Sequence, residues 1–237
     1  MKRNSPLLRT VLLLTFFSIA MGFLEAAVVI YLRELYYPKG FNFPLAPISP
    51  TIALVEFLRE AATVIMLLCI GIIAGKNKAE RFSFFIFCFA VWDIIYYVVL
   101  KLFLNWPESF LTPDILFLIP IPWVGPVITP CIISVTMIVL TMIVVHYHQR
   151  NIIITINKRE WFLLIFGALV LVVSFCWDYA GYVLRNNHSL WLPSSKEKLF
   201  DEVKNYIPQS FNWWLFSVGE MIVVAALIHI VRRHKKL

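Results

Sequence analysis

Seven ionisable side chains lie inside long apolar stretches of this sequence, where a charge is costly. Six of them are carboxylic acids and one is an arginine. An acidic side chain at the centre of a membrane-spanning helix costs about 2.5–3.5 kcal/mol on insertion scales, so such residues normally face the interior of a helix bundle and mark a functional site. The seven residues are Glu25, Glu56, Arg59, Glu60, Asp93, Asp178 and Glu220.

A group of carboxylates around one arginine predicts one of two chemistries. Since Arg59 alone cannot neutralise six acids in a low-dielectric site, either some acids are protonated or a cation lies among them. Hard divalent cations such as Mg²⁺, Ca²⁺ and Mn²⁺ prefer carboxylate ligands, and a buried carboxyl group can serve as a general acid or base. The expected cation ligands are Glu60, Asp93 and Glu220. The expected catalytic residues are Glu60, Asp93, Glu56 and Glu220.

A short repeated motif adds two tyrosines to this set. The strings VWDIIYYV and CWDYAGYV both fit the pattern Trp-Asp-x-x-x-Tyr-Val. Residues four apart share a helix face, so Asp93 is expected beside Tyr97 and Asp178 beside Tyr182. Arg59 would hold an anionic or polar group of a substrate. The expected substrate-binding residues are therefore Arg59, Glu25, Asp178, Tyr97 and Tyr182.

Common catalytic signatures are missing from the sequence. It contains no HExxH, no GxSxG and no glycine-rich phosphate loop, and no span contains the Glu-x-x-His motif of di-iron bundles. The sequence therefore does not identify a cofactor beyond the divalent cation that carboxylates alone would suit.

The composition decides the class of protein. The chain has 237 residues, of which 60% are hydrophobic and only 15% charged, with a mean hydropathy of +0.80. A soluble domain of this length needs more polar surface, so we predict an integral membrane protein. Backbone groups in lipid must be satisfied within each segment, and about 20 apolar residues cross a bilayer, which predicts a single all-α domain of six transmembrane helices. The predicted spans are 10–34, 51–74, 82–104, 126–148, 160–184 and 211–231.

The charges of the connecting segments predict the orientation. Basic residues gather before the first span, in the second and fourth loops and in the tail, whereas the first and third loops together hold only Lys39. The positive-inside rule then places both termini in the cytoplasm. We expect a multi-pass protein of the cell membrane and, from its size, of a bacterial inner membrane. The net charge of +7 reflects topology and anionic lipid, and no nucleic-acid partner is expected.

The predicted depths of the charged residues along the spans place all of them in the outer half of the membrane or at its midplane. At 1.5 Å per residue, Glu56 and Glu60 lie about 9 and 15 Å below the outer boundary, and Asp93 lies near the midplane. Glu56, Arg59 and Glu60 fall within about 100° of arc, so they share one helix face. The inner half is expected to hold no acid. The pattern predicts a polar funnel that opens outward.

Two outer loops and one pair of glycines carry further structural signals. The loop NWPESFLTPDILFLIPIPWVGP has five prolines, which exclude an ordinary span and favour an interfacial or shallow re-entrant cover, with Trp106 and Trp123 at headgroup level. The fifth loop contains SSKEKLFDEVKNYIP, which predicts a short amphipathic helix on the outer surface. Gly71 and Gly75 form a GxxxG pair that could support a homo-oligomer.

Three functions fit these features. The first is an outward-opening acidic pocket that binds a cation, a small molecule or a lipid-like substrate, and that could belong to a membrane-embedded enzyme. The second is a cation- or proton-coupled permease that uses the acids as a relay. The third is a structural subunit or assembly factor with a buried ion-pair network. The absence of a midpoint Gly-Pro break in any span counts against the permease.

Overall fold

The structure, a computed structural model, describes residues 6–119, 121–150, 152–185 and 205–235. Within these ranges six helices are long and apolar enough to cross a membrane. They match the predicted spans to within a few residues at each end, which is consistent with a polytopic helical membrane protein. The amphipathic surface helix expected in the fifth loop falls largely outside the described residues. The elements in chain order are α1 (Pro6–Tyr36), α2 (Pro50–Ala74), α3 (Lys78–Leu104), β1 (Pro113–Phe117), β2 (Trp123–Pro126), α4 (Ile128–Gln149), α5 (Lys158–Arg185) and α7 (Trp213–His234).

Local capping sets the helix boundaries. α2 begins after Ser49, whose Oγ accepts a hydrogen bond from the backbone N–H of Ile52 at 3.3 Å. α3 begins after Asn77, whose Oδ1 accepts a hydrogen bond from the backbone N–H of Glu80 at 3.0 Å. The same helix ends at Asn105, which adopts the left-handed conformation with φ of 51°. These caps give the apolar segments defined ends.

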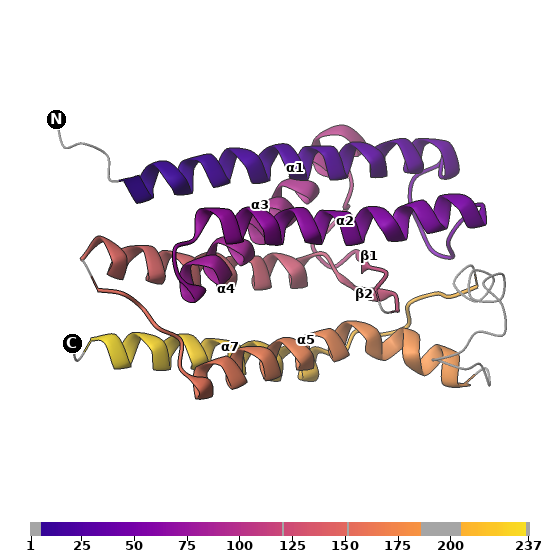
Figure 1. Cartoon of the computed structure of the whole chain (residues 1–237). Helices are drawn as coiled ribbons and strands as arrows, with labels where there is room; N and C mark the ends of the chain where they lie inside the picture. Colours follow the sequence, from indigo (N-terminus) through magenta and orange to yellow (C-terminus); the bar gives the residue numbers. More distant parts are fainter. Residues whose placement is uncertain (1–5, 120, 151, 186–204, 236–237) are drawn as a thin grey trace.

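α3 is the central helix of the N-terminal part of the bundle. It packs against α1, α2 and α4, and its span is the most buried of those described, whereas α5 packs mainly against α7. α1 and α2 run antiparallel along one side of the bundle (Figure 1), yet few of their residues approach each other closely because both helices rest on α3. The start of α1 and the end of α7 lie at the same end of the bundle (Figure 1). Which end faces the cytoplasm stays a prediction from the charge pattern.

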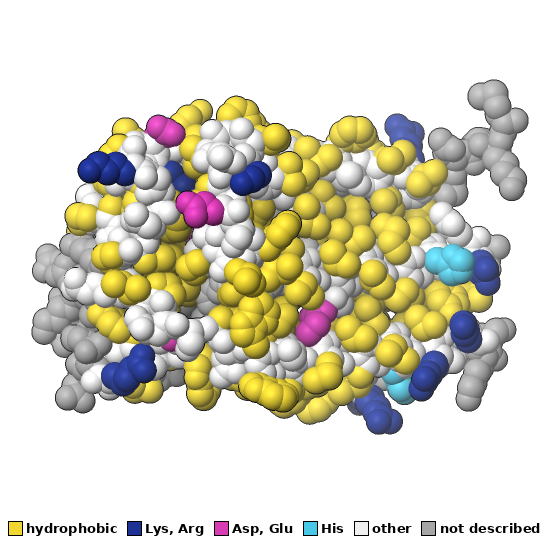
Figure 2. Space-filling view, turned by 180° about the vertical axis from the view of Figure 1, so that it is seen from behind, with side chains coloured by type: hydrophobic (Ala, Val, Ile, Leu, Met, Phe, Trp, Pro, Cys, Tyr) yellow, Lys and Arg dark blue, Asp and Glu magenta, His cyan; other side chains and the backbone are white. Residues whose placement is uncertain are grey.

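The surface carries a broad hydrophobic belt. Large side chains such as Phe16, Ile73 and Trp214 are exposed along the helices. Figure 2 shows hydrophobic side chains over the middle of one face, with Lys, Arg and His gathered toward its ends. Soluble monomers rarely expose an apolar area of this extent, and the distribution is the one that a lipid environment requires.

Gly71 and Gly75, at the end of α2, meet α3 of the same chain. A Cβ atom at Gly71 would lie 2.7 Å from the backbone N of Phe85, and one at Gly75 would lie 2.4 Å from the backbone N of Arg81. No side chain fits at such distances, so the two glycines allow the end of α2 to approach the start of α3. Both are used within the chain, and the homo-oligomer stays a prediction.

The Pro-rich third outer loop is the exception to the all-helical expectation. β1 and β2 form an antiparallel hairpin in which Asp114 pairs with Gly125 and Ile115 with Val124. Prolines prevent a helix here, so the backbone groups are satisfied by strand pairing instead. The turn of the hairpin reaches Glu60, about 15 Å along α2 from Pro50 at 1.5 Å per residue. The loop therefore enters the bundle as a re-entrant hairpin.

Packing of the two tryptophans shows that the hairpin is part of the interior. Trp106 is only 7% exposed, and the Trp123 ring stacks on Phe175 of α5 with centroids 6.1 Å apart. Both rings contact protein side chains of the bundle, and their depth relative to the lipid head groups stays a prediction. The hairpin contacts α1, α2 and α3 through Asp114 and Leu118, and β2 packs against α5 (Figure 1).

Candidate functional site

A cavity of about 700 Å³ lies between α1, α2, α3 and the hairpin. It occupies the half of the bundle next to residues 37–49, which we call the outer half. Its walls are mostly apolar, and two of them, Leu54 and Phe57, are also exposed on the membrane-facing side of α2. The cavity wall thus continues onto the lipid-facing surface beside α2. The predicted site residues that line the cavity are Glu25, Glu56, Arg59, Glu60, Asp93 and Tyr97.

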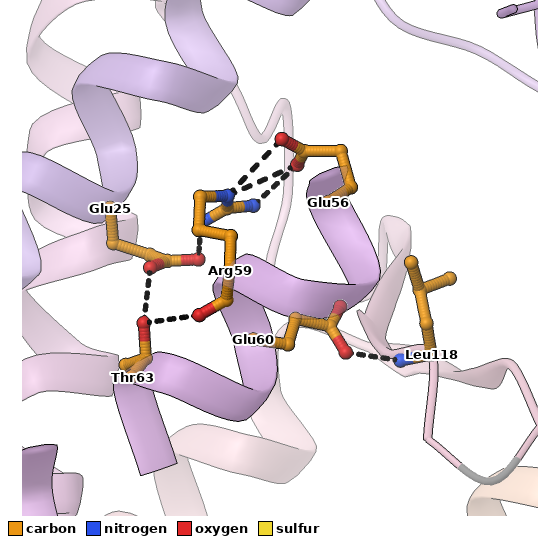
Figure 3. Close-up of polar contacts among 6 residues, drawn as sticks. All are labelled: Glu25, Glu56, Arg59, Glu60, Thr63 and Leu118. Carbon is orange, nitrogen blue, oxygen red and sulfur yellow. Dashed lines mark hydrogen bonds and ion pairs between the residues drawn. The ribbon is translucent and has the colours of Figure 1, made fainter. Parts of the chain in front are cut away.

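Arg59 ties α1 to α2 (Figure 3). Its Nη2 donates to Glu56 at 2.6 Å, its Nε donates to the same carboxylate at 3.2 Å, and its Nη1 pairs with Glu25. Thr63 Oγ1 donates to Glu25 at 3.2 Å. The guanidinium is therefore matched to two carboxylates from within the chain, and it has little remaining capacity for the substrate anion that the sequence predicted for it.

Glu60 and Asp93 have a different environment from Glu25 and Glu56. Glu60 points away from Arg59 toward the hairpin, and its Oε2 accepts a hydrogen bond from the backbone N–H of Leu118 at 2.9 Å (Figure 3). Asp93 Oδ2 accepts a hydrogen bond from Ser134 Oγ of α4 at 2.9 Å. Within the described part of the chain, neither carboxylate forms an ion pair. These two acids keep acceptor capacity that faces the cavity.

A second ion pair borders the cavity, and neither of its partners is among the predicted site residues. Asp114 of β1 accepts hydrogen bonds from Arg33 Nη2 at 3.1 Å and from the Tyr97 hydroxyl at 3.2 Å. Arg33 also lies over the rings of Trp106 and Phe41, 3.7 and 4.1 Å from their centroids. Burial raises the pKa of Asp114, and the nearby Arg33 guanidinium opposes that rise because it favours the charged carboxylate.

This ion pair changes the role of Tyr97. Tyr97 was expected beside Asp93, four residues earlier on the same helix, as a substrate-binding residue, and its hydroxyl donates to Asp114 of the hairpin. In the sequence, Asp114 could have been noticed as an acid within a mostly apolar, proline-rich loop. Arg33 could have been noticed because it lies two helical turns beyond Glu25.

Three other predicted site residues lie outside the cavity. Asp178 of α5 accepts hydrogen bonds from the Tyr206 hydroxyl at 2.7 Å and from the backbone N–H of Gln209 at 3.0 Å. Tyr182 packs its ring against Tyr206, with centroids 5.4 Å apart. Glu220 of α7 accepts a hydrogen bond from Thr136 of α4. In place of the predicted polar funnel, the structure has a cavity formed by three helices and a hairpin, and the two Trp-Asp motifs serve different parts of the fold.

The arrangement also bears on the predicted cation site. Across the residues that the structure describes, no group of three or more His, Cys, Asp and Glu side chains is placed to hold a metal ion. Glu60 and Asp93 line the same cavity, whereas Glu220 lies on α7 beside α4. The three expected ligands are therefore not brought together.

The expectation that the inner half holds no acid is wrong. Glu160, in the first turn of α5, is fully buried and accepts a hydrogen bond from the backbone N–H of Asn157 at 2.8 Å. Its carboxylate also contacts His229 Nδ1 and the Arg233 guanidinium of α7, each at 2.9 Å. These contacts fasten the inner end of α5 to the inner end of α7.

Glu80 makes the equivalent contact between α3 and α4. It is 4% exposed, accepts a hydrogen bond from the backbone N–H of Lys76 at 2.9 Å and lies 2.8 Å from His148 Nδ1. Glu80 and Glu160 each follow an asparagine by three residues, and each asparagine accepts a hydrogen bond from the backbone N–H of its glutamate. The inner half of the bundle thus has two similar side-chain fastenings.

These features define a class of protein: a polytopic helical membrane protein with buried charged residues and an amphipathic cavity in one half of its bundle. No protein-family model, curated protein or solved structure matches the chain. A fold alone does not specify an activity, so function is inferred from the chemistry of the cavity.

Proposed function

We propose that this protein binds an amphipathic molecule with a basic group, such as an amine, in the cavity of its outer half. The observation that carries this proposal is the placement of Glu60 and Asp93. Both line the cavity, and among the described residues each accepts a hydrogen bond from one neutral donor, Glu60 from the Leu118 backbone N–H and Asp93 from the Ser134 hydroxyl. A cationic group placed between them would supply the charge partner that buried carboxylates require.

The remaining cavity walls support an apolar portion of the ligand. Val29, Leu32, Leu54 and Phe57 contribute side chains from α1 and α2, and the hairpin adds further apolar walls. Ligand sites are commonly apolar with a few polar groups that fix orientation. Because Leu54 and Phe57 are also exposed toward lipid, we propose that the ligand enters from the membrane between α1 and α2.

The other charged residues support the cavity. Glu56 is occupied by Arg59, and Glu220 lies outside the cavity, so of the predicted catalytic residues the proposal retains Glu60 and Asp93. The Arg59 and Arg33 ion pairs hold α1, α2 and the hairpin around them. Any acid–base chemistry on the bound molecule would act through the same two carboxylates.

The inner ends of the bundle favour a pocket over a permease. The Glu80 contact with His148 fastens α3 to α4, and the Glu160 contacts fasten α5 to α7. A permease needs an inner path that opens in turn with the outer one. Buried carboxylate contacts at the inner ends would have to break for that path to form, whereas a pocket reached from the outer half leaves them intact.

The proposal is tested with the purified protein in detergent and a matched pair of probes, octylamine and octanol. We expect octylamine to raise the melting temperature more than octanol, because only the amine supplies a charge for Glu60 and Asp93. Glu60→Gln and Asp93→Asn should each weaken octylamine binding by at least about tenfold, the factor for one charge-assisted hydrogen bond. Glu34→Gln is the matched control, since Glu34 is exposed on α1 and does not line the cavity.

Two results would contradict the proposal. One is equal stabilisation by octylamine in the wild type and in both cavity variants. The other is stabilisation by Mg²⁺, Ca²⁺ or Mn²⁺, but not by octylamine, that both substitutions abolish, which would assign the carboxylates to a cation. Uptake of labelled cation into proteoliposomes that depends on Glu60 and Asp93 would favour the permease.

A further inference from the structure

A second hollow lies between α4 and α7. Its volume is about 460 Å³, and its walls include Val135 and Val139 of α4 and Val224 and Ile228 of α7. All four side chains are exposed. α4 and α7 make only sparse contact, in contrast to the closely packed α3–α4 and α5–α7 pairs. The hollow is therefore a groove that faces lipid, and a hydrocarbon chain must fill it in a membrane.

The groove has the length of one leaflet. Near the middle of the bundle it ends at Thr136, which donates a hydrogen bond to Glu220. Its other end is at Lys235, eleven residues beyond Val224, which corresponds to about 16 Å of helix. Half the hydrocarbon thickness of a bilayer is about 15 Å. A single acyl chain thus fits along the groove from the inner boundary to the midplane.

The charge at the inner end of the groove specifies the head group. Arg232 and Lys235 are the charged residues that line the groove, and both are exposed. The neighbouring Arg233 is directed instead to Glu160 of α5. Basic side chains between transmembrane helices at the cytoplasmic boundary are suited to anionic lipid head groups. The apolar walls and the two cations thus match the two parts of one molecule.

We propose that the α4–α7 groove is a binding site for an anionic glycerophospholipid of the inner leaflet. One acyl chain lies along Val139 and Ile228, and the phosphate lies between Arg232 and Lys235. This site is separate from the outer cavity and does not depend on the function proposed for it. Bound lipid would fill the gap between α4 and α7 and so join the α1–α4 part of the bundle to the α5–α7 pair.

The test compares phosphatidylglycerol with phosphatidylcholine, added to the full-length protein in detergent and counted by native mass spectrometry. We expect phosphatidylglycerol to remain bound at concentrations where phosphatidylcholine does not. Removal of both groove cations in Arg232→Gln/Lys235→Gln should weaken phosphatidylglycerol binding roughly 30-fold, the factor for two basic groups at an anionic head group. The matched control is Lys158→Gln/Arg159→Gln, which removes two exposed cations at the same end of the bundle but outside the groove.

A second variant tests the acyl chain separately from the charge. Val139→Trp fills the groove and keeps both cations, so phosphatidylglycerol binding should fall in a protein that remains monodisperse. Equal losses in the groove pair and the control pair would overturn the proposal, because they would show attraction to basic residues in general. It would also be overturned if glycerol phosphate, which has no acyl chain, competed for the site, or if Val139→Trp bound the lipid like the wild type.

Discussion

Arg59 and Glu60 are adjacent in the sequence but serve different parts of the molecule. Arg59 joins α2 to α1 through Glu25 and also pairs with Glu56 of its own helix, whereas Glu60 accepts a hydrogen bond from the turn of the hairpin. Two residues on the same face of a helix can therefore have different partners. The face of α2 that holds Arg59 and Glu60 covers an arc of about 100°, which is wide enough to contact both α1 and the hairpin. This division leaves Glu60 available to a ligand and engages Arg59 in the scaffold.

Substitution of Arg59 should reveal its structural role. Arg59→Gln leaves Glu25 and Glu56, which are partly buried, without a cation. Breaking a fully buried pair costs about 3–5 kcal/mol, so we expect a smaller loss here. We expect a clearly lower melting temperature in detergent, with partial recovery in the Glu25→Gln/Arg59→Gln double variant. Arg9→Gln, at an exposed position on α1, is the control and should melt like the wild type. An unchanged melting temperature in Arg59→Gln would contradict this role.

The sequence predicted part of the site at the residue level. Glu25, Glu56, Arg59, Glu60 and Asp93 were predicted because a charge in an apolar span is costly and has to face the interior. Asp114 carries no such signal, because an acid in a loop is ordinary until the loop folds into the bundle. Asp178 and Glu220 meet the same cost as Asp93, but Asp178 accepts hydrogen bonds from Tyr206 and Gln209 and Glu220 accepts one from Thr136, away from the cavity. Sequence position alone does not separate these cases.

The hairpin is the element that sequence reasoning could not derive. The prolines excluded a helix, and an entering loop was expected. The strand register depends on contacts that are distant in sequence, such as the ion pair between Asp114 and Arg33. The starts of α3 and α5, at the inner end of the bundle, carry a sequence signal. Asn77 and Asn157 each precede a glutamate at capping-box spacing. Unlike the hairpin, the six spans can be predicted directly from the length of the apolar segments.

The packing of α2 on α3 gives an element-scale prediction. A Cβ atom at Gly71 would lie 2.7 Å from the backbone of Phe85, so Gly71→Ala has to move one helix away from the other, at a typical cost of about 1–3 kcal/mol. We expect a lower melting temperature and an unchanged molar mass by light scattering. Gly181→Ala is the control, because a Cβ there meets nothing within 4 Å.

The opposite result at Gly71 would be informative. If Gly71→Ala changed the molar mass without lowering the melting temperature, the glycine would serve contact between two copies of the chain. That result would contradict the assignment of Gly71 to the α2–α3 contact and would support the predicted homo-oligomer.

At the scale of the whole molecule, the orientation can be tested directly. The charge pattern predicts both termini in the cytoplasm, and the first loop on the opposite side. Green fluorescent protein fused after Leu237 should therefore fluoresce, and alkaline phosphatase fused after Gly40 should be active. A dark carboxyl-terminal fusion with an inactive phosphatase fusion would reverse the orientation and move the cavity to the cytoplasmic half.

The few close approaches between α1 and α2 have a consequence for how binding is measured. A ligand that enters between these helices reaches the cavity by two-dimensional diffusion within the leaflet. Its effective concentration is then its mole fraction among the lipids, and dilution into more bilayer lowers occupancy even when the total aqueous concentration is constant. Affinities for this protein are therefore comparable only when they are expressed per lipid or per detergent molecule.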